Sequence, residues 1–148
     1  MRIKRETIFA LLAIAALVLS SCSTKYKDGT YTAQSGTVVG KEDEAGVGDG
    51  YGEVTITMLD NKVILCSFTL YTNDNVEKGV DFGKVENGEV TDQEYYNKAQ
   101  RQVQAAKNYA SQLTATGSLK EVSEISGASA AYEAFKGAVE EALKQAKK

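Results

Sequence analysis

The chain of 148 residues contains no proline, no histidine and no tryptophan. Without proline, no residue interrupts a helix by removing a backbone hydrogen-bond donor. Without histidine, the chain has neither an imidazole base that titrates near neutral pH nor a histidine metal ligand. The remaining side chains show no serine–lysine or cysteine-based nucleophile arrangement of the kind that hydrolases use. The sequence therefore predicts no catalytic residue and no metal site.

Acidic residues outnumber basic ones by 20 to 17, and the formal net charge is −3. Removal of residues 1–21, which are predicted below to be a signal peptide, would take away three basic side chains and one acid and leave a net charge of −5. A mildly acidic protein repels phosphate backbones, so the composition argues against nucleic-acid binding. The size and hydrophobic fraction fit one soluble domain.

The first segment, "MRIKRETIFALLAIAALVLSSC", has the layout of a secretory signal. A basic start precedes the apolar run 8–19, which is shorter than the roughly 20 residues that span a bilayer. The run ends in Leu-Ser-Ser-Cys, which resembles a bacterial lipobox. We therefore predict a lipoprotein signal peptide over residues 1–21 and a diacylglycerol on the thiol of Cys22. An ordinary signal peptide followed by a chance cysteine is the alternative.

Lipidation would place the protein on the extracytoplasmic face of the cell membrane. Each methylene of the lipid that is buried in the bilayer contributes about 0.8 kcal/mol to anchoring. Residues 22–28 are predicted to be a lipidated tether, followed by one domain over residues 29–148. With Cys22 lipidated, Cys66 has no disulfide partner in the chain. Because Cys66 lies in the apolar run "VILCSFTLY", we predict a small core residue and no reactive thiol.

The pattern along the domain is strands first and helices afterwards, which predicts an α+β fold with a small antiparallel sheet packed with two main helices. The sequence predicts strands at 29–34, 51–59 and 63–72, long loops at 35–50 and 73–91, a helix over about 92–114 and a last helix from Ser129.

Apolar periodicity predicts which side chains face the core. The second strand alternates with Val54, Ile56 and Met58 inward, and the third is expected to bury Ile64, Cys66, Phe68 and Leu70. The first helix shows one apolar stripe, with Gln102 assigned to another, polar face. Thr91 and Glu94 stand at the spacing of a capping box at its start.

The loop over residues 40–50, which contains "KEDEAGVGDG", is rich in acids and glycine. It lacks the regular spacing of alternate oxygen ligands that calcium loops have, so we predict a solvated loop and no metal site.

The last helix begins with the four small residues Ser126-Gly127-Ala128-Ser129. A helix N-terminus presents unpaired backbone N–H groups and partial positive charge. Gly127 and Ala128 would let an anion approach the backbone closely, and Ser129 offers a hydroxyl there. These residues therefore allow a phosphate site. They also suit a plain loop-to-helix junction with either serine as the cap, which these four residues alone favour because short motifs often match by chance.

Four stretches in their order resemble the FMN-binding domain family, which occurs in subunits of Rnf-type and sodium-pumping NADH:quinone complexes. They are "YKDGTYTAQS", "GYGEVTITMLDNKV", "QEYYNKAQRQVQAAKNYASQL" and "SGASAAYEAFKGAVEEALKQAKK". Together they cover most of the domain, and the chain looks most similar to the bacterial surface lipoprotein branch of that family.

The resemblance implies a cofactor and its attachment site. The family motif reads Asp-x-x-Ser-Gly-Ala-Thr or Ser, and a flavin transferase uses FAD to ester-link FMN, through its phosphate, to the last hydroxyl residue. By resemblance that residue is Ser129, and Ser126, Gly127 and Ala128 would shape the site. Ser123 stands where the motif has its acid.

The implied function is a redox carrier without turnover of its own. It would exchange electrons with quinone-linked or other redox proteins while anchored in the membrane through Cys22. Because Ser123 departs from the motif, an alternative stays open: a surface lipoprotein of the same fold that binds FMN noncovalently, or that has lost the flavin and has a structural or ligand-binding role.

Overall fold

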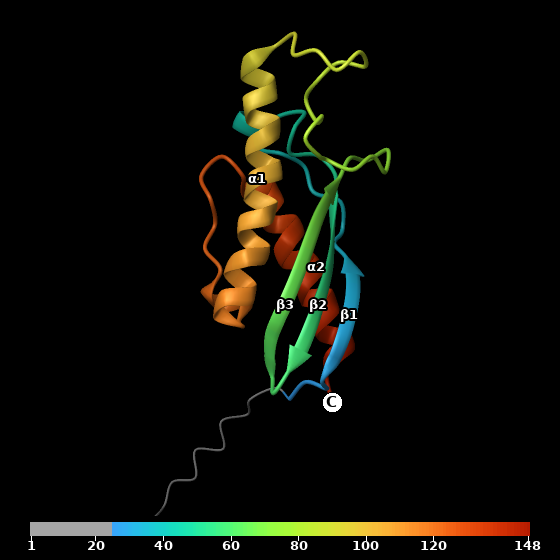
Figure 1. Cartoon of the computed structure of the whole chain (residues 1–148), viewed down its shortest axis with the longest axis vertical. Coiled ribbons are helices and arrows are strands. Elements are labelled where there is room, and N and C mark those ends of the chain that lie inside the picture. The colour runs from blue at the N-terminus through green and yellow to red at the C-terminus, as the bar shows by residue number, and fades with distance from the viewer. Residues whose placement is uncertain (1–24) are drawn as a thin grey trace, which may run out of the picture.

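The computed structural model describes residues 25–148, so the predicted signal peptide and Cys22 lie outside the described residues. Strands precede helices along the chain (Figure 1), which confirms the predicted α+β class. The elements are β1 (Gly29–Gln34), the short 3-10 turn η1 (Glu42–Glu44), β2 (Tyr51–Leu59), β3 (Lys62–Tyr71), α1 (Gln93–Thr116), the 3-10 turn η2 (Leu119–Glu121) and α2 (Ser129–Ala146).

The three strands form one antiparallel sheet in the order β1-β2-β3. The β2–β3 hairpin turns at Asp60 and Asn61, which have φ angles of 50° and 63°. Aspartate and asparagine tolerate this left-handed conformation better than most residues, so they suit a tight hairpin turn. Both helices cover the same face of the sheet, with α1 against β3 and α2 across β1 and β2 (Figure 1).

A β-bulge in β3 changes which side chains of that strand face the core. Thr57 pairs with Leu65 while the next residue, Met58, pairs with Val63, so Ile64 is the extra residue. An extra residue reverses the alternation of side chains on its strand. Val63 is therefore buried and Ile64 is 40% exposed, so the prediction that Ile64 faces the core is wrong. Beyond the bulge, the prediction that Phe68 and Leu70 are buried is confirmed.

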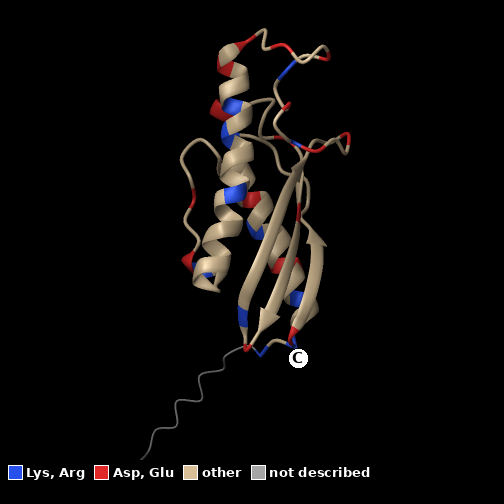
Figure 2. Ribbon diagram, viewed as in Figure 1, with Lys and Arg blue, Asp and Glu red and all other residues tan. Residues whose placement is uncertain are grey.

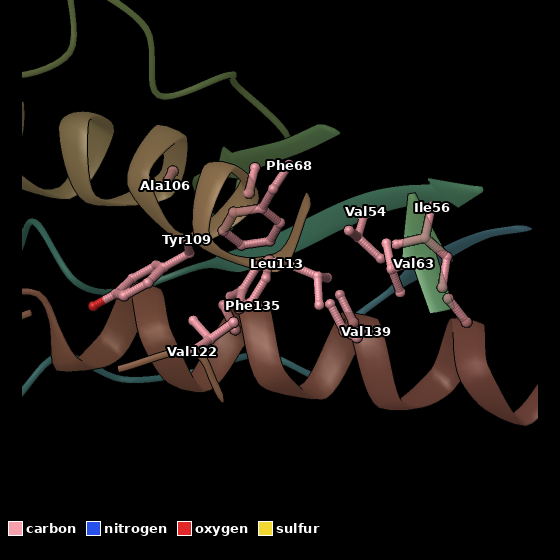
Figure 3. Packing of buried hydrophobic residues seen from close by; sticks show 14 of the residues in the cluster. Val54, Ile56, Val63, Phe68, Ala106, Tyr109, Leu113, Val122, Phe135 and Val139 are labelled. Atoms are coloured by element: carbon pink, nitrogen blue, oxygen red, sulfur yellow. The ribbon is translucent and has the colours of Figure 1, made fainter. Parts of the chain in front are cut away.

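The core lies between the sheet and the two helices. Figure 3 shows Tyr109, Phe135 and Phe68 toward one end of the cluster, with Val54, Val63 and Ile56 toward the other. Phe135 stacks on Tyr109 with 5.6 Å between ring centroids and meets Phe68 edge-on at 5.1 Å. The predicted inward faces of β2 and α1 are largely confirmed, although Gln102, which we had placed on a polar face, is only 1% exposed.

The predicted tether is shorter than expected, because the chain is already bound to the domain at Lys25. Lys27 donates its backbone N–H to Ala146 O at 2.7 Å, and Lys148 donates to Lys25 O at 3.1 Å. Tyr26 N–H donates to the Asn61 side chain at 2.8 Å. The start of the described chain therefore lies beside the end of α2, at the opposite end of the molecule from the long loops (Figure 1).

Candidate anion site at the start of helix α2

Helix α2 begins at Ser129, as predicted, and the three preceding residues take distinct positions. Ser126 is exposed, Gly127 is partly buried, and Ala128 is fully buried as the N-cap residue. Gly127 has a φ of 75°, and a Cβ there would lie 2.6 Å from an Arg101 guanidinium nitrogen. The left-handed conformation therefore favours glycine at 127, whereas the close atoms belong to the flexible side chain of Arg101, which has room to shift.

Two side chains of α1 hold this junction in place. Gln102 donates its side-chain amide to Gly127 O at 3.0 Å. The Tyr109 hydroxyl donates to Ala128 O at 3.1 Å and accepts the backbone N–H of Ile125 at 2.9 Å. Burial raises the pKa of Tyr109 to about 12, so its phenol remains a donor at neutral pH. Helix α1 is therefore the scaffold that fixes the first turn of α2.

A carboxylate from a distant loop occupies the start of α2. Glu44, at the end of η1, is only 1% exposed. Its Oε1 accepts the backbone N–H of Ser129, and its Oε2 accepts that of Ala130 at 2.9 Å. The Ser129 hydroxyl lies 3.2 Å from both carboxylate oxygens. The helix N-terminus thus holds an anionic group with two oxygens, and that group belongs to the chain itself.

This arrangement corrects two predictions from the sequence. Neither Ser126 nor Ser129 caps α2, since the N-cap residue Ala128 offers no side-chain hydrogen bond and the cap is Glu44, 85 residues away. The loop over residues 40–50 is also not simply solvated, because Val47 and Gly48 are buried together with Glu44. No acidic residue occupies the first turn of α2, which leaves the positive end of its dipole to the remote carboxylate.

A buried amine supports the loop that carries Glu44. Lys78 is 4% exposed and donates to Val47 O at 2.8 Å and to Asp49 O at 2.7 Å. Burial lowers the pKa of Lys78 to about 8, although the negative charges of Asp49 and Glu44 act in the opposite direction. The loop backbone is therefore tied to the second long loop through one side chain.

The acids near the motif do not take part in the site. Ser123 and Glu124 are exposed, and so is Glu121. Within residues 25–148, no hydrogen bond joins the side chains of these three residues to the start of α2; the Ser123 backbone pairs with the Gln112 side chain instead. The carboxylate nearest to Ser129 is thus supplied by Glu44, which reasoning from the sequence missed.

The donors at this helix start suit a phosphate as well as a carboxylate. Two backbone N–H groups and one hydroxyl converge on two anionic oxygens, and a phosphodiester also presents two charged oxygens. The resemblance implies a phosphate at this place, where the structure has the Glu44 carboxylate. The donors fit FMN phosphate, but the space is filled, and Ser129 is 7% exposed while Glu44 remains there.

Outside this site, we looked for a reactive thiol, a metal cluster and a membrane-spanning helix among residues 25–148. Cys66 is a free, partly buried thiol whose pKa burial raises to about 12, so it is protonated at neutral pH. Residues 25–148 contain no group of three or more acids or cysteines placed to hold a metal ion. In the same range, no helix has the length and hydrophobicity needed to cross a bilayer.

Comparisons with known proteins add a fold and no function. No family model and no curated protein matches the chain. Among solved structures, it is similar to the crystal structure of the CPE2226 protein from Clostridium perfringens, a structural-genomics target. The match covers 82% of this chain and 89% of that one, with a TM-score of 0.53 at 19% identity. A likeness at this identity extends to the fold alone.

Proposed function

We propose that this protein is a membrane-anchored, extracytoplasmic FMN-binding lipoprotein that carries electrons, with FMN ester-linked through its phosphate to Ser129. The lipid anchor is the one predicted on Cys22, and the attaching enzyme is a flavin transferase that uses FAD. The electron donors and acceptors are quinone-linked or other redox proteins of the membrane. The proposal rests on the resemblance of the sequence and on the anion-binding start of α2.

One observation carries the proposal: the start of α2 already holds an anion. The N–H groups of Ser129 and Ala130 converge on the two oxygens of the Glu44 carboxylate, and the Ser129 hydroxyl is at the same place. A phosphodiester on Ser129 would put its charge at the positive end of the helix dipole, which is favourable.

The residues of the chain have defined tasks in this proposal. Ser129 would supply the ester oxygen, and the N–H of Ala130 would donate to a phosphate oxygen. Gly127 and Ala128 would keep side chains away from the phosphate, while Gln102 and Tyr109 hold the backbone of the junction. The isoalloxazine ring would supply the redox chemistry, so the protein needs no acid or base of its own.

The proposal is tested by whether flavin stays with the protein after unfolding. Residues 23–148, the mature chain without its lipidated cysteine, would be coexpressed with a flavin transferase, precipitated with acid, washed and examined for flavin fluorescence. We expect fluorescence in the precipitate of the natural sequence and none in that of Ser129→Ala. Flavin that washes away from both proteins would rule out the ester.

A second candidate is the surface lipoprotein of the same fold with noncovalent or lost flavin. The burial of Ser129 beneath Glu44 favours it, and so does Ser123 in the place of the motif acid. It would be recognised by flavin that washes away, or by colourless protein, when the chain is isolated from its native membrane. Loss of retained flavin in Ser129→Ala isolated in the same way would contradict it.

A further inference from the structure

We propose that a cleft at the anchored end of the domain binds an anionic phospholipid, with the headgroup phosphate among its lysines and the first methylene groups against its apolar walls. We call it the hairpin cleft, and its lining residues include Tyr26, Lys62, Lys120, Tyr132, Lys136 and Leu143. The presence of a membrane beside the cleft rests on the proposed lipid on Cys22. The chemistry of the cleft rests on the described residues alone.

The hairpin cleft lies where the β2–β3 hairpin, the end of α1 and one side of α2 meet, and it has a volume of about 680 Å³. Gly117 caps the end of α1, and its carbonyl accepts the N–H of Val63 at 3.1 Å. A Cβ at Gly117 would lie 3.2 Å from the Lys62 Cβ, so the link after α1 passes close to the hairpin. Backbone contacts therefore hold one wall in place, and the volume is in the range of small-molecule sites.

Apolar side chains line much of the cleft. Met58 and Val63 belong to the core, with exposed fractions of 2% and 3%. Leu119, Tyr132 and Leu143 are partly buried and pack against the same core. A phosphate ion alone would leave this apolar surface in water, whereas the methylene groups of a lipid would remove it from water, which is favourable. The walls therefore favour an occupant that has an apolar part.

The charged side chains of the cleft are mostly positive. Lys62, Lys120 and Lys136 line it, and Glu140 is the single acid among its lining residues. Lys136 lies 3.9 Å from Glu140, but Lys62 and Lys120 are exposed and form no salt bridge within residues 25–148. A lysine can lay its methylene groups along an apolar surface while its ammonium group stays at the rim. Positive charge beside apolar walls complements an anionic amphiphile.

The chain itself places this cleft beside the predicted anchor. Tyr26 lines the cleft and is four residues after Cys22. An extended chain spans at most about 3.6 Å per residue, so Tyr26 is within roughly 14 Å of the lipidated residue. The N–H of Tyr26 donates to the Asn61 side chain at 2.8 Å, and that of Lys27 donates to Ala146 O at 2.7 Å. Lipids of the bilayer that holds the anchor are therefore within reach of the cleft.

Charge is distributed unevenly between the two ends of the domain. The loops over residues 35–50 and 72–92 contain ten acids and three lysines, and Figure 2 shows acidic segments along them. Residues 25–28, 60–62 and 147–148 meet at the other end and contain two acids and five lysines. An anionic bilayer therefore attracts the end that carries the cleft and repels the long loops, although the domain as a whole is acidic.

The test uses residues 23–148, which contain every described element and carry no lipid. They are sedimented at low ionic strength with vesicles of phosphatidylcholine alone and with vesicles that also contain phosphatidylglycerol. The double variant Lys62→Gln/Lys120→Gln is compared with Lys41→Gln/Lys98→Gln, which has the same net charge but loses one lysine from the first long loop and one from the start of α1. Circular dichroism checks that both variants are folded.

A second measurement needs no substitution. Amide signals of the natural sequence are followed by NMR while short-chain phosphatidylglycerol is added below the concentration at which it forms micelles. Inorganic phosphate is added in a separate titration. The short-chain lipid should shift the amides of Val63, Gly117 and Leu119, which surround the cleft, and inorganic phosphate should not.

We expect the natural sequence to bind the vesicles that contain phosphatidylglycerol and not those of phosphatidylcholine alone. The partition coefficient should fall at least about 10-fold in Lys62→Gln/Lys120→Gln, because each lysine near an anionic surface contributes about fivefold. It should fall less than about twofold in Lys41→Gln/Lys98→Gln, whose lysines are far from the bilayer. Absence of binding to both vesicles, or an equal loss in both variants, would overturn the inference. Inorganic phosphate that shifts the three amides as strongly as the lipid would also overturn it.

A mass measurement separates this inference from the proposed function. The full chain and its Cys22→Ala variant are isolated from membranes, and the mass of lipid on residue 22 is determined. Lipid on Cys22 together with a selective loss of vesicle binding in Lys62→Gln/Lys120→Gln supports both proposals. Lipid without that selective loss supports the anchor and contradicts the cleft. A selective loss without lipid on Cys22 supports the cleft and contradicts the anchor.

Discussion

The two main helices begin in different ways. Helix α1 is capped by its own N-cap residue, since the exposed Asp92 side chain accepts the N–H of Tyr95 at 2.9 Å. Helix α2 is capped by Glu44 from a loop 85 residues earlier, in a fully buried contact. The first cap serves one helix alone, whereas the second makes the first turn of α2 and the loop over residues 40–50 depend on each other.

The difference shows that the same structural need can be met by a neighbouring side chain or by a distant one. Any helix start has unpaired N–H groups and favours an anion. At α1 a local side chain meets that need, so no donors are left for a ligand. At α2 the buried carboxylate of Glu44 occupies the donors instead.

The two caps should differ most when each capping carboxylate is replaced by its amide. We expect Glu44→Gln to lower the free energy of unfolding by about 2–3 kcal/mol, because it removes buried, charge-assisted hydrogen bonds. Asp92→Asn should change it by less than about 0.5 kcal/mol, since asparagine caps helices as well as aspartate does. Urea unfolding measures both. Equal effects would show that the burial of Glu44 has no energetic consequence.

Lys78, whose amine supports the loop over residues 40–50, should make the free energy of unfolding depend on pH. The pKa of Lys78 is about 8 in the folded protein, against an ordinary value of 10.5 for a lysine in the unfolded chain. Between pH 8 and 10.5 the unfolded chain therefore binds more protons than the folded protein. Rising pH over that range should therefore favour the folded state, by on the order of 2 kcal/mol relative to Lys78→Met. Unfolding curves at pH 7.5, 9 and 10 compare the two proteins. Parallel pH dependence in both would contradict a buried, charge-disfavouring site for Lys78.

A change that leaves every carboxylate in place can still break the remote cap. In Gly48→Ala the added methyl group would lie 2.5 Å from Gly40 Cα and would press on Ala130. We expect a loss of about 1–2 kcal/mol from this overpacking, together with faster exchange of the Ser129 amide. Gly36→Ala is the matched control, because a Cβ there meets nothing within 4 Å. If Gly48→Ala and Gly36→Ala have the same free energy of unfolding and the same exchange of the Ser129 amide, close packing of Gly48 against Ala130 has no consequence for the start of α2.

Removal of the cap of α1 should have a modest effect on stability and none on the start of α2. Asp92→Ala is expected to lower the free energy of unfolding by about 1 kcal/mol. It should leave hydrogen exchange at Ser129 and Ala130 unchanged, because no contact links Asp92 to α2 in the described chain. Faster exchange of the Ser129 and Ala130 amides in Asp92→Ala would mean that the two helix starts are coupled.

Much of the fold was predictable because local patterns determine it. The alternation over 51–59 and the apolar stripe of α1 gave the right faces, and Gly117 ends α1 in the left-handed conformation. The inward placement of Ile64 was wrong because a bulge has no signature in an apolar run. The capping box at Thr91 was also wrong, by one residue, since Asp92 is the cap.

The site was predictable only in part. The start of α2 at Ser129 followed from helical periodicity, but Glu44 did not, because its contact spans 85 residues and no pattern marks it. One signal was available: the first turn of α2 lacks an acid, while "KEDE" sits in an otherwise glycine-rich loop. A missing local partner and a surplus of acids elsewhere favour a remote cap, although they do not say which acid supplies it.

The most direct test of the account is the intact mass of residues 23–148 after coexpression with a flavin transferase in the presence of FAD. The account predicts a gain equal to FMN less one water in the natural sequence and no gain in Ser129→Ala. Colourless protein of unchanged mass would contradict it, and yellow protein of unchanged mass would establish noncovalent FMN in place of the ester.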